Sequence, residues 1–212
     1  MKKFDTFLYF ITDSSGFTDD EVLKITEDAI KGGATIIQLR EKEKTTAEYI
    51  SLAEKMHTLT SKHHIPLIID DRLDVALAVN AEGVHLGQSD MPVSSARKIA
   101  GDNFIIGATA KTVNQAVLAY GQGADYLGVG AIYPTTTKVK TIPTSIDTLT
   151  QICTAVPIPV NAIGGLNADN LGILKGTGIC GICIVSAIMR AKNPYETTKN
   201  LARQTKFVLG KD

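Results

Sequence analysis

The sequence predicts a single (β/α)8 barrel spanning residues 1–212. Short β-branched runs alternate with longer helical patterns along the chain, and glycine-containing turns close each helix before the next strand. The strand candidates are apolar almost throughout, as expected for parallel strands covered on both faces. Eight such units of about 26 residues fill the chain, near the lower size limit of this fold. An open doubly wound sheet, the competing architecture, usually needs fewer strands.

Each element follows from its local pattern. Strands are predicted at Phe7–Asp13, Thr35–Glu41, Pro66–Asp71, Gly83–Gln88, Phe104–Ala110, Tyr126–Tyr133, Ile158–Gly165 and Gly181–Ile188. Helices are predicted between them, among others at Asp19–Lys31, Thr45–Ser61, Val113–Gly121 and Ala168–Lys175. Asp19 or Asp20 is expected to cap the first of these helices, and Gly32 to end it.

Composition excludes several classes of protein. The 22 basic and 22 acidic residues balance, which argues against a nucleic-acid partner. No run of 18 apolar residues predicts a membrane span. An odd cysteine count fits a reducing cytoplasm. Cys180 and Cys183 have redox or zinc spacing, but a separation of three sends strand side chains to opposite faces, so both are interpreted as buried apolar groups. The sequence is compatible with assembly into a homo-oligomer and does not determine the oligomeric state.

The second strand carries polar residues at alternating positions. Gln38, Arg40 and Lys42 are spaced by two and therefore share one face of the strand. In a (β/α)8 barrel the chemistry lies at the carboxyl ends of the strands, so these residues predict an anion-binding cradle there. The alternative is a solvated strand end in which the cations pair with Glu41 and Glu43.

Acidic residues follow the third and fourth strands. Asp71 and Asp90 are expected on neighbouring parts of the same rim. Mg²⁺ is typically held by one or two carboxylates together with substrate phosphates, so the pair is a candidate magnesium site beside the cradle. Spacing alone leaves an equal alternative, in which Asp70, Asp71 and Asp90 cap the helices that follow.

Later loops predict a second anion pocket. The stretch Tyr133–Lys138 is rich in hydroxyl groups and ends in a lysine, and Gly165 precedes a predicted helix. Ser186 follows the eighth strand, and barrels often bind phosphate with the loops after strands 7 and 8. His85 falls within a strand, and no histidine has an acidic or cysteine partner at triad spacing. No histidine is therefore predicted to be a catalytic base.

Seven blocks of sequence resemble the thiamine phosphate synthase family, in the family's order and over nearly the whole chain. They are QLREK at 38–42, IDDRLDVAL at 69–77, GVHLGQSD at 83–90, GATAKT at 107–112, YPTTTK at 133–138, AIGGL at 162–166 and VSAI at 185–188. The resemblance implies a (β/α)8 transferase that joins a pyrimidine diphosphate to a thiazole phosphate. The products would be thiamine monophosphate and pyrophosphate.

The resemblance also implies a role for individual residues. Asp71 and Asp90 would ligate Mg²⁺, and Arg40, Lys42 and Lys138 would be catalytic by stabilising the departing pyrophosphate. The substrate-binding residues would be Gln38, Leu39, Arg40, Glu41, Lys42, Asp70, Thr109, Thr135, Thr136, Thr137, Lys138, Gly165, Val185 and Ser186.

Two positions depart from the family pattern. Asp70 stands where the family usually has an asparagine that contacts the pyrimidine, and Thr109 replaces a usual serine. A carboxylate at position 70 only accepts hydrogen bonds, so two outcomes are open: it still accepts from the exocyclic amine of the pyrimidine, or it weakens diphosphate binding through repulsion. The alternatives are a thiazole tautomerase of the same superfamily and a non-catalytic binding protein. The tautomerase is associated with a histidine in the fifth-strand block, which here contains Lys111 instead.

Overall fold

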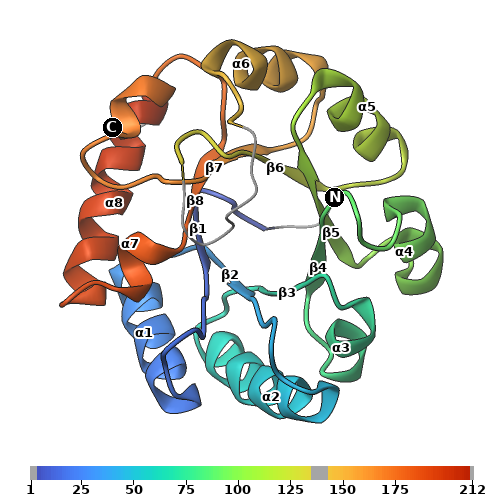
Figure 1. Ribbon diagram of the computed structural model, residues 1–212, viewed down its shortest axis with the longest axis vertical. Helices are drawn as coiled ribbons and strands as arrows, with labels where there is room; N and C mark the ends of the chain where they lie inside the picture. The colour runs from blue at the N-terminus through green and yellow to red at the C-terminus, as the bar shows by residue number, and fades with distance from the viewer. Residues whose placement is uncertain (1–3, 135–142, 211–212) are drawn as a thin grey trace.

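Parallel strands close into a barrel inside a ring of helices (Figure 1). The computed structural model describes residues 4–134 and 143–210. Each strand pairs with the next along the chain, and β8 pairs with β1, so the predicted (β/α)8 barrel is confirmed. The strands are β1 Leu8–Ile11, β2 Ile36–Leu39, β3 Leu67–Asp70, β4 Gly83–Leu86, β5 Ile105–Ala110, β6 Tyr126–Gly130, β7 Val160–Ile163 and β8 Gly181–Ile184.

Helices link the strands on the outside of the barrel. They are α1 Asp19–Gly32, α2 Thr46–Lys62, α3 Leu73–Ala78, α4 Val93–Ala100, α5 Val113–Gly121, α6 Ile146–Ala155, α7 Ser186–Met189 and α8 Pro194–Leu209. The cap of α1 is Thr18, which forms a capping box with Glu21, and not the expected Asp19 or Asp20. None of the helices within the described ranges combines the length and apolar character needed to cross a membrane.

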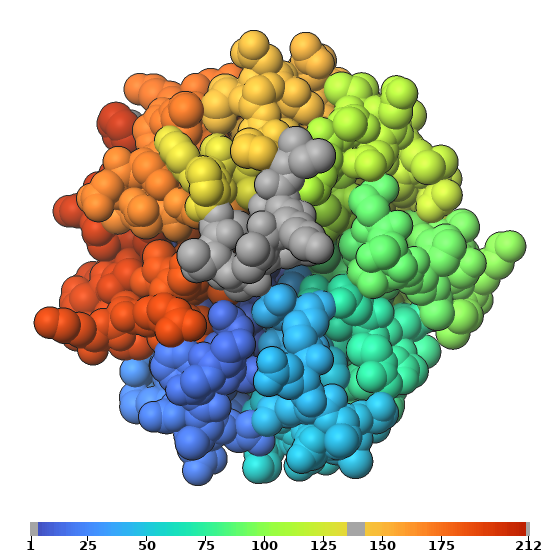
Figure 2. Space-filling model, viewed as in Figure 1, coloured from blue at the N-terminus to red at the C-terminus, as the bar shows by residue number. Residues whose placement is uncertain are grey.

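Strand alternation divides the apolar residues into two layers. Leu8 and Phe10 of β1 face outward and pack in the large layer beneath the helices. Tyr9 and Ile11 face inward, where they join residues of other strands inside the barrel. The outer ring closes where α1 meets α8, because Gly32 has no side chain to hold the two helices apart. The two segments, blue and red, lie side by side in Figures 1 and 2.

The structure differs from the sequence-based prediction at the boundaries of several elements. The predicted helix at Ala168–Lys175 is only a 3-10 turn, η1 (Leu171–Leu174). Asn167 and Asn170 make local hydrogen bonds there that compete with a helix, and Gly172 weakens it further. The sequence predicts an eighth strand that reaches Ile188, but β8 ends at Ile184 and α7 begins two residues later.

Most of the other strands are also shorter than predicted, so many polar residues assigned to strand ends lie in the following loops. Cys183 is buried as expected. Cys180 is exposed, which contradicts its interpretation as a buried apolar group, because it lies just before β8 begins.

Candidate active site

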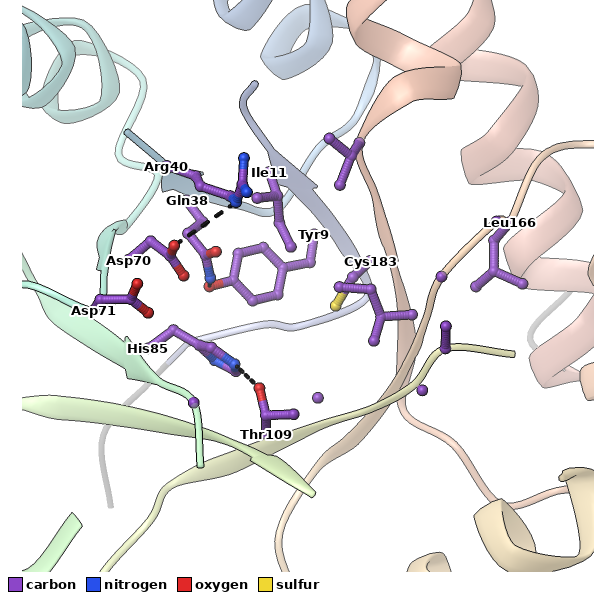
Figure 3. A pocket seen from close by; sticks show the side chains of 18 of the residues that line it. Tyr9, Ile11, Gln38, Arg40, Asp70, Asp71, His85, Thr109, Leu166 and Cys183 are labelled. Carbon is purple, nitrogen blue, oxygen red and sulfur yellow. Dashed lines mark hydrogen bonds and ion pairs between the residues drawn. The ribbon is translucent and has the colours of Figure 1, made fainter. Parts of the chain in front are cut away.

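A cavity of about 340 Å³ opens at the carboxyl ends of the strands. Figure 3 shows side chains from strands on several sides converging on it. Of the residues predicted from the sequence, it is lined by Gln38, Arg40, Lys42, Asp70, Asp71, Asp90, Thr109, Gly165, Val185 and Ser186. The structure therefore brings together residues that lie up to 148 positions apart in the chain (186 minus 38).

Two cations form one wall of this cavity. Arg40 Nη1 lies 3.6 Å from Asp13 Oδ1, and its Nε lies 3.9 Å from Asp70 Oδ2. Lys42 Nζ donates to Asp70 Oδ2 at 2.7 Å and also to Asp71. The alternative of a solvated strand end paired with Glu41 and Glu43 is wrong, since the carboxylates that pair with these cations come from the end of β3 and from the loops after β1 and β3.

Two residues that the family resemblance assigns to substrate binding point elsewhere. Leu39 is fully buried in the outer apolar layer. Glu41 accepts a hydrogen bond from Ser14 Oγ at 2.7 Å. Neither side chain lines the cavity, so any contact that these residues make with a ligand would be through the main chain.

The carboxylates of Asp71 and Asp90 form a linked pair. Burial by itself raises the pKa of Asp71, but hydrogen bonds with Lys42 and Asp90 outweigh it and lower the pKa. Burial and the hydrogen bond with Asp71 raise the pKa of Asp90. Asp71 also has a φ of 60°, a left-handed conformation that is uncommon outside glycine. Opposite shifts of this kind are expected for two carboxylates held close together, because the charge of one disfavours the charged form of the other.

The helix-capping alternative does not hold. The N-cap residue before α3 is Arg72, and the N-cap residue before α4 is Pro92, and neither side chain makes a capping hydrogen bond. Asp90 Oδ2 instead accepts from the main-chain N–H of Gly87 at 2.7 Å, which fixes the loop after β4.

Asp70 is the most buried carboxylate of the site, with 10% of its side chain exposed. Burial, and then the charge of Asp71, raise the pKa of Asp70, against the opposing charge of Lys42. Burial alone would lower the pKa of Lys42, but Asp70 and Asp71 together raise it. An acidic residue thus occupies part of the cationic wall.

A glycine turn faces these charges across the cavity. Gly164 and Gly165 after β7 have φ values of 102° and 65°, which side-chain-bearing residues rarely adopt. A Cβ on Gly165 would lie 2.7 Å from both Pro134 O and Tyr133 Cβ, so the loop after β6 packs directly on this turn. Thr135, Thr136, Thr137 and Lys138 lie outside the described residues.

The sequence missed several residues of the cavity floor. Tyr9, Ile11 and Cys183 line it from β1 and β8, and His85 from β4. Tyr9 and Ile11 were detectable in principle, because alternation along β1 places them on the inner face. Nothing in the local sequence shows that His85 meets the β5 and β6 side chains.

A closed (β/α)8 barrel has the architecture of a barrel enzyme when a cavity at the carboxyl ends of its strands carries polar groups, here the cations Arg40 and Lys42 beside the carboxylates Asp70, Asp71 and Asp90. Residues 8–188 match the family model for thiamine monophosphate synthase, and the chain belongs to this family. It is therefore a transferase of the same kind as its relatives.

Individual relatives agree with this assignment. A thiamine-phosphate synthase of Enterococcus faecalis is 48% identical over 202 residues, which are 95% of each chain. One from Clostridium tetani is 48% identical over 200 residues, covering 94% of this chain and 96% of the relative. A solved structure of thiamine phosphate pyrophosphorylase from Pyrococcus furiosus superposes with a TM-score of 0.88 at 39% identity. It covers 97% of this chain and 98% of its own.

Proposed function

We propose that the chain joins a 4-amino-2-methyl-5-(diphosphooxymethyl)pyrimidine to a thiazole phosphate, giving thiamine monophosphate and pyrophosphate. One observation carries the proposal. A single cavity holds the cations Arg40 and Lys42, the carboxylate pair Asp71 and Asp90, and a glycine turn at Gly165. Family membership supplies the reaction, and these groups match the charges of its two substrates.

The cationic wall suits the pyrimidine diphosphate. Arg40 can bind phosphate oxygens through two parallel hydrogen bonds, and Lys42 adds a point charge, with Lys138 proposed to join them. In the reaction the bond between the pyrimidine methylene carbon and the diphosphate oxygen breaks, and the diphosphate takes the electron pair. The thiazole nitrogen then donates its own pair to that carbon. Neither step removes a proton, so stabilisation of the leaving diphosphate is the main requirement.

The carboxylate pair fits a magnesium ion. Asp71 and Asp90 lie close enough to shift each other's pKa in opposite directions, and a divalent cation between them would offset the repulsion of their charges. The described residues contain no group of three or more His, Cys, Asp or Glu side chains that could hold a metal. Two carboxylates are nevertheless a usual protein contribution to a Mg²⁺ site, whose remaining ligands are phosphate and water oxygens. When bound, Mg²⁺ would neutralise charge on the diphosphate.

The opposite side of the cavity suits the thiazole phosphate. The turn at Gly164 and Gly165 lets main-chain N–H groups approach an anion closely, and Val185 and Ser186 line the same side. Thr135, Thr136 and Thr137 are proposed to complete this pocket. We also propose a cytoplasmic location, because Cys153, Cys180 and Cys183 are all free thiols.

Pyrophosphate release by the purified protein tests the proposal. The assay contains the pyrimidine diphosphate, the thiazole phosphate and Mg²⁺, and each is omitted in turn. Release that depends on all three, together with thiamine monophosphate, is the expected result. A folded protein that binds thiazole phosphate but releases no pyrophosphate would refute the synthase reaction.

A further inference from the structure

A chain of hydrogen bonds crosses the floor of the cavity from β2 to β5. Gln38 Nε2 donates to Tyr9 Oη at 2.7 Å, and Tyr9 Oη lies 2.8 Å from Tyr126 Oη. Tyr126 Oη lies 3.1 Å from His85 Nδ1, and His85 Nε2 lies 3.0 Å from Thr109 Oγ1. Figure 3 shows Gln38 reaching the Tyr9 hydroxyl and His85 reaching Thr109. Both ends of the chain line the cavity.

The middle of the chain is sealed from solvent. Tyr9 and Tyr126 are fully buried, and Gln38, at one end of the hydrogen-bond chain, is only 2% exposed. A Cβ on Gly107 would overlap the Tyr126 ring, so this glycine makes room for the phenol. Burial raises the pKa of both phenols well above the usual value, and each therefore keeps one proton to donate. Among the described residues, the hydroxyls of Tyr9 and Tyr126 have no hydrogen-bond partners other than each other, Gln38 and His85.

These restrictions determine which group donates and which accepts at each hydrogen bond from Gln38 to Thr109. An amide nitrogen only donates, so Tyr9 accepts from Gln38 and must give its own proton to Tyr126. Tyr126 then accepts from Tyr9, and its proton is directed to His85 Nδ1. With Nδ1 acting as an acceptor, the ring proton of His85 is on Nε2 and is donated to Thr109. The reverse order would leave the Tyr9 proton buried without an acceptor.

We infer that Tyr9 and Tyr126 are positioning residues that fix the Nε2–H tautomer of His85 and thereby orient the Thr109 hydroxyl as a hydrogen-bond donor to the substrate. Thr109 Oγ1 accepts from His85, and within the described part of the chain it meets no other partner. Its own proton is thus free to point into the cavity. At the other end, Gln38 uses its amide nitrogen on Tyr9 and presents its oxygen as an acceptor.

The tautomer can be measured without substrate. Nitrogen-15 NMR of histidine-labelled protein distinguishes an Nε2–H from an Nδ1–H imidazole, and the His85→Gln variant identifies the signals of His85. We expect Nε2–H in the wild-type protein and a mixed or reversed tautomer in Tyr126→Phe. The matched control is Tyr49→Phe. It also removes a buried hydroxyl, but this hydroxyl donates to Leu39 O and takes no part in the hydrogen-bond chain from Gln38 to Thr109. An Nδ1–H ring in the wild type, or an unchanged ring in Tyr126→Phe, overturns the inference.

A double-mutant cycle tests the route through Thr109, and this part rests on the proposed function. Thr109→Val and Tyr126→Phe should each lower kcat/KM for the pyrimidine diphosphate by about five- to tenfold, the effect of one hydrogen bond. The double variant should be no worse than Thr109→Val alone, and Thr109→Ser should restore activity. Losses that multiply overturn the inference.

Two further outcomes remain distinguishable. If Tyr126→Phe does not fold, Tyr9→Phe offers a second test. It leaves His85 Nδ1 as the one described acceptor for the buried Tyr126 proton, so the Nε2–H tautomer should persist, and a reversed tautomer would overturn the inference. If the wild-type protein releases no pyrophosphate, the proposed function fails, while the NMR result still decides the direction of the chain.

Discussion

Replacing Asp70 by asparagine should strengthen binding of the pyrimidine diphosphate. Asp70 Oδ2 lies 2.7 Å from Lys42 Nζ and 3.9 Å from Arg40 Nε, so it occupies the cations that we assign to the diphosphate. An arriving diphosphate must share these cations with a buried carboxylate. Asp70→Asn keeps the shape of the side chain, removes its charge, and leaves Lys42 paired with Asp71.

The size of the effect follows from the geometry. A phosphate oxygen bound to a second proton of Lys42 would lie about 4.5 Å from Asp70 Oδ2, because the two acceptors sit at tetrahedral positions around the ammonium group. Two unit charges at that separation repel by about 4 kcal/mol at an effective dielectric constant near 20. The Lys42 side chain is 42% exposed, so solvent screens part of this repulsion. We expect about 1.4 to 2.8 kcal/mol, which is about a 10- to 100-fold lower Kd.

Isothermal titration of the pyrimidine diphosphate, at constant Mg²⁺, measures this change, and turnover should be equal to or higher than in the wild type. Asp28→Asn is the matched control, because it removes one negative charge from α1, where Asp28 pairs with Lys24 at 2.8 Å. That variant should bind like the wild type. Weaker binding or a large loss of turnover in Asp70→Asn would refute the reasoning and show that Asp70 itself contributes to binding or catalysis.

Three other predictions concern the proposed binding of diphosphate and Mg²⁺. Arg40→Ala and Lys138→Ala should each raise the Kd of the pyrimidine diphosphate about 10- to 100-fold, as expected for a charged hydrogen bond, while binding of thiazole phosphate by calorimetry stays unchanged. Asp71→Ala or Asp90→Ala should abolish the dependence of the rate on Mg²⁺, and a wild-type magnesium response in both variants would contradict the metal assignment. The raised pKa of Asp90 keeps this carboxyl protonated to a higher pH than an ordinary aspartate. Mg²⁺ affinity, measured by titration at a series of pH values, should therefore fall as pH decreases through that raised pKa; an affinity that holds down to the usual pKa of aspartate would oppose this.

The sequence predicts the barrel and most of its cationic wall for a simple reason. Alternation predicts one face for Gln38, Arg40 and Lys42, and all three line the cavity, although β2 ends at Leu39 and only Gln38 lies within the strand. A second rule, that parallel strands end at one edge of the barrel, places Asp71 and Asp90 on a common rim.

What the sequence cannot give is the partner of each polar group. The position of Asp70 between Arg40 and Lys42 depends on the register of β2 against β3. The contact of His85 with Tyr126 joins residues 41 positions apart and depends on the barrel closing. The irregular turn at η1 arises from side-chain hydrogen bonds that override a helical pattern.

The most direct test of the account is the stoichiometry of the reaction. Pyrophosphate and thiamine monophosphate are measured in the same samples, with wild-type protein, both substrates and Mg²⁺. Because the departing diphosphate and the attacking thiazole nitrogen act on the same carbon, the account predicts equal amounts of the two products at every time. Pyrophosphate released without thiamine monophosphate would show hydrolysis instead of transfer and would contradict the account.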